Sequence, residues 1–123
     1  MTEEEVAREI VDAALAVHRE LGPGLLESAY EQCLAFELAR RGLKVERQKE
    51  LPIEYQGMRI DAGYRIDLLV ADTIIVELKA VERVEPIHEA QLLYYLKLAK
   101  RRIGFLINFN VRLLKDGVRR LVL

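Results

Sequence analysis

The fold is decided by two stretches of the sequence, Tyr64-Arg65-Ile66-Asp67-Leu68-Leu69-Val70 and Ile74-Ile75-Val76-Glu77-Leu78-Lys79-Ala80. Both have the aliphatic composition of central β-strands, yet charged side chains interrupt them. Burying an ionised group without a partner is expensive, so Asp67, Glu77 and Lys79 each need a counter-charge, a hydrogen-bond network or a metal ion. We therefore expect these three side chains to form one polar cluster.

The cluster depends on the register between the two strands. Alternation along a strand places Glu77 and Lys79 on the same face. Asp67 joins them if it lies opposite Glu77, which a loop with an odd number of residues, such as 71–73, would produce. A shift of one residue would turn Asp67 to the other face and break the cluster.

Two carboxylates beside an ammonium group have two interpretations. Mg²⁺ and Mn²⁺ prefer oxygen ligands and leave positions open for a phosphate oxygen, while a nearby lysine can orient or help deprotonate the attacking water. Alternatively, Lys79 neutralises Asp67 or Glu77 in a structural ion pair. These three residues alone do not decide between a metal site and an ion pair.

The surrounding sequence predicts helices before and after these strands. Capping residues, the Gly22-Pro23-Gly24 break and a change of apolar period from helical to two mark the boundaries. The expected elements are helices from Thr2 to Leu21 and from Leu25 or Leu26 to Gly42, strands from Val45, around a turn at Gln56-Gly57, over 64–70 and over 74–81, a helix from Glu85-Pro86 to Arg101-Arg102, and strands over 104–108 and 119–123. The central strands read as an antiparallel meander in a single domain, residues 1–123.

Composition excludes several classes of protein. With 123 residues, 51% hydrophobic, 32% charged, 7 Gly and 3 Pro, the chain is neither disordered nor collagen-like. Its apolar stretches fall far short of the ~20 residues of a membrane span, so we expect no membrane association. The acidic start at Thr2 to Glu5 and the single cysteine, Cys33, predict a cytoplasmic protein.

Charge is unevenly distributed, although the net charge is only -1. Residues 1–39 hold nine acidic and two basic side chains, whereas residues 40–123 hold eleven acidic and seventeen basic ones. This bias either places a cationic surface beside an acidic one or reflects solvated helix ends and an edge strand. Any site for a polyanion must therefore be local.

Two helices supply further candidate residues. Glu27 follows the glycine-proline break, with Tyr30 three residues on and facing the same side, although a first-turn carboxylate is also favoured by the helix dipole. Gln91 and Tyr95 are four residues apart on the third expected helix and share a face suited to a phosphate backbone or to steadying a lysine. Taken alone, Glu27 is more typical of an ordinary first-turn carboxylate, and Gln91 and Tyr95 are more typical of ordinary boundary positions.

Together these residues resemble the PD-(D/E)XK nuclease superfamily. Its pattern is an Asp on one strand, Glu-x-Lys on the next, an upstream helical Glu and a downstream Gln-x-x-x-Tyr, here Glu27, Asp67, Glu77-Leu78-Lys79, Gln91 and Tyr95. Gly24 to Tyr30 and Leu106 to Phe109 resemble elements of the GxxExxY protein family. The residue before Asp67 is Ile66 rather than proline, a departure common in the superfamily.

The resemblance implies a fold, a metal and an activity. The fold is a restriction-endonuclease-like αβββαβ core with an extra N-terminal helix, that is, an α/β domain with a mixed sheet flanked by helices. Mg²⁺, or Mn²⁺ as a substitute, would bind Asp67, Glu77 and the backbone carbonyl of Leu78, with Glu27 completing the cluster directly or through water. Lys79 would serve the nucleophilic water, while Gln91 and Tyr95 would support Lys79 and the nucleic-acid backbone.

The implied function is metal-dependent hydrolysis of nucleic-acid phosphodiester bonds, with DNA as the expected substrate. Two alternatives stay open: a catalytically silent nucleic-acid-binding or assembly module that retains the fold, and a purely structural ion-pair network. Because a domain this small rarely cuts both strands of a duplex alone, we also expect a homodimer or a larger complex.

Overall fold

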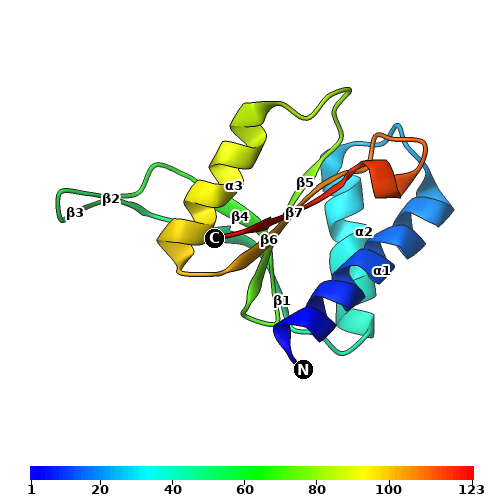
Figure 1. Ribbon diagram of the computed structural model, residues 1–123, viewed down its shortest axis with the longest axis horizontal. Helices are drawn as coiled ribbons and strands as arrows, with labels where there is room; N and C mark the ends of the chain where they lie inside the picture. Colours follow the sequence, from blue (N-terminus) through cyan, green and yellow to red (C-terminus); the bar gives the residue numbers. More distant parts are fainter.

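A mixed five-stranded sheet lies between α1 and α2 on one face and α3 on the other (Figure 1). The computed structural model describes all residues, 1–123. The elements in chain order are α1 Glu3–Leu21, α2 Glu27–Arg40, β1 Val45–Glu50, β2 Ile53–Tyr55, β3 Met58–Ile60, β4 Arg65–Val70, β5 Ile74–Lys79, α3 Pro86–Ala99, β6 Ile103–Asn108, the short 3₁₀ helix η1 Leu114–Asp116, and β7 Val118–Val122. None of the helices is long and apolar enough to cross a membrane.

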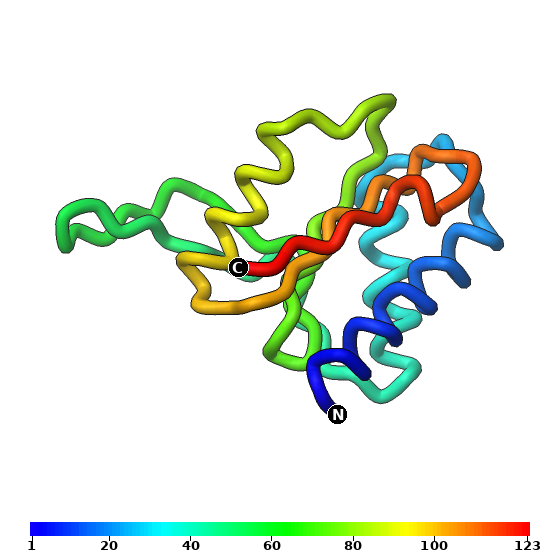
Figure 2. Tube along the Cα trace, viewed as in Figure 1, coloured from blue at the N-terminus to red at the C-terminus, as the bar shows by residue number.

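The strand order in the sheet is β1-β4-β5-β6-β7. Only β5 and β6 pair in parallel, since α3 carries the chain across the sheet between them, and the other neighbours are antiparallel. The expected α/β fold with a mixed sheet and an extra N-terminal helix is thus confirmed. β2 and β3 form a separate hairpin that projects from the body of the molecule (Figure 2).

Side-chain alternation divides the core into two parts. Leu68, Val76 and Leu78 point into the larger part beneath α1 and α2. Leu69 and Ile75 point into a smaller part beneath α3. Glu77 and Lys79 alternate with the inward-facing Val76 and Leu78 on β5, which assigns them to the α3 face.

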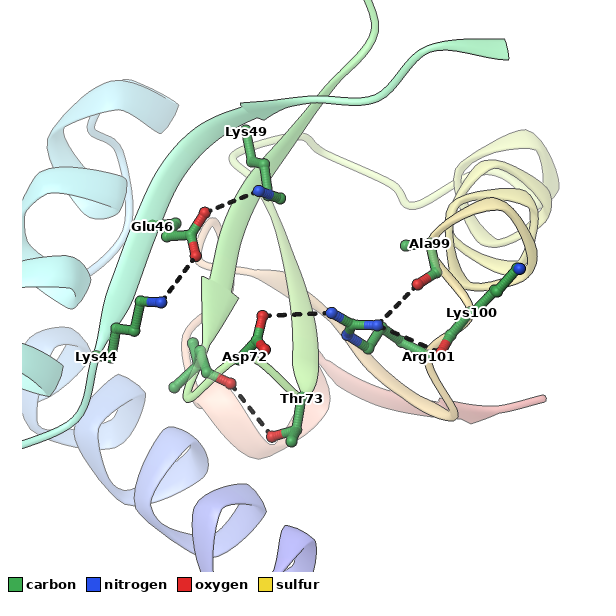
Figure 3. Close-up of polar contacts among 9 residues, drawn as sticks. Lys44, Glu46, Lys49, Asp72, Thr73, Ala99, Lys100 and Arg101 are labelled. Carbon is green, nitrogen blue, oxygen red and sulfur yellow. Dashed lines mark hydrogen bonds and ion pairs between the residues drawn. The ribbon is translucent and has the colours of Figure 1, made fainter. Parts of the chain in front are cut away.

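The turn between β4 and β5 sets the register of these two strands. Val70 pairs with Ile74 and Leu68 with Val76, so the loop is 71–73, as the sequence predicts. Asp72 has a left-handed backbone, φ 58°, and its carboxylate accepts a hydrogen bond of 3.3 Å from Arg101, beyond α3 (Figure 3). Thr73 Oγ1 donates to the carbonyl of Val70 at 3.3 Å. These contacts stabilise the turn and with it the relative position of Asp67 and Glu77.

The basic C-terminal part of the chain lies against acidic side chains. Of the eight basic residues from Lys97 onward, four form ion pairs: Arg101 with Asp72, Arg102 with Glu3, Arg119 with Glu89 and Arg120 with Glu4. Two of these pairs join the C-terminal region to the first turn of α1. The charge bias of the sequence is therefore partly neutralised within the fold.

Candidate active site

The carboxylates of Asp67 and Glu77 each accept a backbone hydrogen bond from the opposite strand, where β4 and β5 separate. The last paired residues of these strands are Leu68 and Val76. Beyond them, the amide of Asp67 donates to Glu77 Oε2 at 2.7 Å, and the amide of Leu78 donates to Asp67 Oδ2 at 2.9 Å. The two carboxylates thus replace the backbone acceptors that a continuous ladder would supply, and both lie at the same end of the two strands.

Burial makes the negative charge of this pair costly. Burial, followed by the charge of Asp67, raises the pKa of Glu77 to about 8. Burial also raises the pKa of Asp67, and the nearby Glu31 adds to the rise. Lys79, half-buried on the same strand as Glu77, opposes both shifts without cancelling them. A cation bound beside these carboxylates would lower both pKa values, because it favours the ionised forms.

The end of β5 is held in place by the neighbouring strand β6. The carbonyl of Lys79 accepts a 2.9 Å hydrogen bond from the amide of Phe109. The buried side chain of Asn108 accepts from the amide of Val81 at 3.1 Å and donates to the carbonyl of Val81 at 2.9 Å. These bonds fix the backbone on both sides of Ala80, and with it the position from which the Lys79 side chain extends.

Glu27 lies at the same end of β5. As the first residue of α2 it is exposed, and its Oε2 accepts a long hydrogen bond of 3.4 Å from the amide of Ala80. No hydrogen bond joins it to Asp67 or Glu77. The structure therefore brings Glu27 to the residue following Lys79, beside the carboxylate pair but not in contact with it.

Tyr30 determines where α2 begins. Its fully buried ring stacks on Phe109 with centroids 4.6 Å apart. Its hydroxyl donates to the carbonyl of Gly22 at 2.6 Å and accepts from the amide of Leu25 at 3.1 Å, so it bridges the glycine-proline break. Tyr30 thus points into the core, whereas Glu27, three residues earlier, is exposed. Their environments differ, although the spacing predicted that both side chains face the same side.

α3 places Gln91 and Tyr95 over the same face of the sheet. Tyr95 is buried, and burial, followed by the charges of Glu77 and Asp67, raises its pKa to about 12. The hydroxyl of Tyr95 therefore stays protonated at neutral pH, and it lies within the electrostatic influence of the two carboxylates. Gln91 is half-buried and lines the same groove as Tyr95, and neither side chain hydrogen-bonds to Lys79.

Two polar residues beside the site, Glu31 and Gln48, were not predicted from the sequence. Glu31 is buried and accepts hydrogen bonds from Arg47 at 3.0 Å and from Gln48 Nε2 at 2.6 Å. Gln48 Nε2 also donates to Asp67 Oδ1 at 3.2 Å, which links α2 to the carboxylate pair through β1. The available signal was the position of Glu31, one helical turn after Glu27.

The residues fit a divalent cation of the Mg²⁺ type. No group of three or more His, Cys, Asp or Glu side chains is placed to hold a metal ion. Mg²⁺, however, keeps several waters and is commonly bound by one or two carboxylates together with substrate phosphates. Asp67 and Glu77 supply this hard-oxygen set, and burial raises the pKa of both carboxyl groups.

Comparison with known proteins identifies the superfamily. A family model described as the PD-(D/E)XK nuclease superfamily matches residues 4–121. Neither the curated proteins nor the solved structures contain a match. Since the match spans almost the whole chain and covers both central strands and α3, the chain belongs to the PD-(D/E)XK nuclease superfamily.

Proposed function

We propose that this protein is a nuclease that hydrolyses phosphodiester bonds of nucleic acid, with DNA as substrate and Mg²⁺ as cofactor. The observation that carries the proposal is the pair formed by the half-buried Asp67 and the buried Glu77, with Lys79 two residues beyond Glu77 on β5. Membership of the superfamily supports a nuclease-like function. The sequence from Gly24 to Tyr30 further supports placement in the GxxExxY group.

The side chains divide the work of the proposed reaction. Asp67, Glu77 and the carbonyl of Leu78 would hold the cation, and Glu27 would reach it through water. The bound cation would supply Lewis-acid polarisation of the phosphoryl group and a lower pKa for coordinated water. Lys79 would orient the attacking water.

α3 completes the site from above the sheet. Gln91 would donate its amide hydrogens to a phosphate oxygen, because amide side chains commonly make such backbone contacts. The protonated hydroxyl of Tyr95 would act as a donor toward the same strand or toward the carboxylates. Both side chains come from one face of one helix, so a single rigid element positions them.

Titration calorimetry with Mn²⁺ tests the metal site without a choice of substrate. We expect saturable binding by the parent protein and its loss in Asp67→Ala and in Glu77→Ala. Glu54→Ala is the matched control, because Glu54 is exposed on β2 and forms no ion pair. Unchanged binding in both site variants would contradict the proposed site.

Cleavage is tested with labelled single-stranded and duplex DNA and RNA in the presence of Mg²⁺ or Mn²⁺. We expect the parent to cut DNA and Glu77→Ala and Lys79→Ala to lose activity by at least about a hundredfold, the range of a positioned acid–base or electrostatic group. Because one small domain rarely cuts both strands, light scattering in the same buffer would report the homodimer or larger complex that we expect. Equal cleavage by all variants would contradict the mechanism.

A second candidate function is a catalytically silent nucleic-acid-binding module. The observation in its favour is that both carboxylates already accept backbone hydrogen bonds, so the pair also has a structural role. This function predicts salt-sensitive DNA binding that needs no metal and is not followed by cleavage.

A further inference from the structure

A groove of about 510 Å³ lies beside the candidate site, between α3 and the chain that enters β4. Three of the five tyrosines of the protein line it, namely Tyr64, Tyr94 and Tyr95. The rest of the lining is aliphatic apart from the amide of Gln91, and no charged side chain contributes to it. An anionic strand would therefore meet no carboxylate on entering this groove.

The groove is continuous with the catalytic face. Gln91 and Tyr95 belong to both, and the charges of Glu77 and Asp67 act on the Tyr95 hydroxyl. Tyr64 lies three residues before Asp67 on the same chain segment. A strand whose phosphate lay at the carboxylate pair would therefore have its adjoining bases beside these tyrosines.

Two of the three aromatic rings in the groove are exposed, and the third, that of Tyr95, is buried. Tyr64 and Tyr94 are 42% and 46% exposed, so both rings are accessible from the groove. Tyr64 stands edge-on to the buried Tyr95, with ring centroids 6.3 Å apart and planes at 70°, a contact that helps to hold the exposed Tyr64 ring in place. Lys97, one turn beyond Tyr94 on α3, is exposed and in no ion pair, and its ammonium group is available to a phosphate.

We propose that this groove stacks unpaired nucleobases, so that the substrate class is a single-stranded segment of nucleic acid. The inference rests on the proposed nuclease function and specifies its substrate. Aromatic platforms beside a phosphate-binding site are how proteins hold single strands, since every base offers a π-face. Bases within a duplex have both faces covered by their neighbours and could not stack on Tyr94 or Tyr64 without being extruded.

Fluorescence anisotropy with a short labelled DNA strand, alone or annealed to its complement, tests the groove. The proteins are the parent, Tyr94→Ala, Tyr94→Phe and the control Tyr55→Ala, whose tyrosine is exposed on β2 outside the groove. We expect Tyr94→Ala to weaken single-strand binding about tenfold, within the range for one lost stacking contact. Tyr94→Phe and Tyr55→Ala should bind as the parent does, and the parent should bind the duplex more weakly than the single strand.

Three outcomes would overturn the inference. The first is equal single-strand affinity for all four proteins, and the second is duplex binding as tight as single-strand binding. The third is a change of oligomeric state in Tyr94→Ala with nucleic-acid binding intact, which would make the groove an interface between copies. Thermal unfolding of each variant checks that Tyr94→Ala is folded.

Failure of the nuclease function gives a different pattern. Single-strand binding that depends on Tyr94, with no cleavage in Mg²⁺ or Mn²⁺, would support the groove and contradict the nuclease proposal. Cleavage that is lost in Glu77→Ala, but is unchanged in Tyr94→Ala and equal for single-stranded and duplex DNA, would support the nuclease proposal. The same result would contradict the proposal that the groove binds single strands.

Discussion

The amide of Asp67 donates a hydrogen bond to the carboxylate of Glu77 at 2.7 Å. Glu77, whose charge the candidate site requires, therefore also satisfies a backbone donor at the end of β4. In the same way, the carboxylate of Asp67 accepts a hydrogen bond from the amide of Leu78 at 2.9 Å. Each carboxylate thus accepts a hydrogen bond from the backbone of the opposite strand. The arrangement couples the stability of the β4–β5 end to the protonation of the pair.

The first prediction concerns the pH dependence of stability. The pKa of Glu77 is about 8 in the folded protein against a usual 4.5, so the native state binds more protons than the unfolded state between these values. The free energy of unfolding of the metal-free protein should therefore fall as the pH rises from 5 to 8, by about 1 kcal/mol per pH unit at the steepest. The raised pKa of Asp67 acts in the same direction.

Glu77→Gln isolates this effect. The amide oxygen still accepts from Asp67 but the side chain no longer ionises, so urea unfolding in EDTA should show a flatter pH profile. Glu54→Gln, an exposed substitution on β2, should keep the profile of the parent. Parallel profiles for the parent and Glu77→Gln would show that the raised pKa of Glu77 is not a source of the dependence.

A second prediction is that cation binding releases a proton. At pH 7 Glu77 is largely protonated, whereas a metal ligand must be ionised. Calorimetric titration of Mn²⁺ at pH 7 should therefore give heats that differ between buffers of low and high ionisation enthalpy, corresponding to about one proton released. Above pH 8 the difference should diminish. Identical heats in both buffers at pH 7 would mean that Glu77 does not bind the ion.

The part of the site that follows from strand register was predictable from sequence. Asp67 and Glu77 are in contact because a three-residue loop, 71–73, sets the register of β4 against β5. Period-two alternation and an odd loop length carry this information locally. The order of the elements was likewise predictable, because helix caps and the Gly22-Pro23-Gly24 break mark it.

The remainder of the site depends on tertiary contacts that leave no local pattern. Gln48 has a left-handed backbone, φ 51°, inside β1, a conformation that no strand propensity indicates for glutamine. Glu31 is buried only because Arg47 and Gln48 of β1 reach it. Nor does sequence reveal that 53–60 forms a separate hairpin, since its alternation is the same as that of a strand in the main sheet.

A third prediction separates the two roles of Gln48. Its side-chain amide donates to Glu31 and Asp67, and its backbone has a left-handed conformation that is strained for a residue other than glycine. Gln48→Ala should destabilise the protein by about 1–3 kcal/mol, because the buried Glu31 loses a donor. Gln48→Gly loses the same bonds but adopts the backbone freely, so it should be about 1 kcal/mol more stable than Gln48→Ala. Urea unfolding of the three proteins measures both differences, and an alanine variant at least as stable as the glycine variant would contradict the strain.

The last prediction concerns Asn108, whose side chain holds the backbone beyond Lys79. It is 3% exposed and makes three hydrogen bonds, to the amide and carbonyl of Val81 and to the amide of Asn110. Asn108→Ala leaves the groups of Val81 without their partner and should cost about 2 kcal/mol of stability. The same loss should lower cleavage activity more than the change in folded fraction explains, because Lys79 is held less firmly.

Asn108→Asp sharpens this test. The aspartate retains the two acceptor contacts, but when ionised it cannot donate to the carbonyl of Val81, and it places a negative charge at a buried position. Protonation restores a donor and removes the charge, so Asn108→Asp should approach the parent in stability as the pH falls toward 5, whereas Asn108→Ala should stay below it by a constant amount. If the two variants have the same pH profile, the carbonyl of Val81 does not depend on the donor at Asn108, and Lys79 is held by the sheet alone.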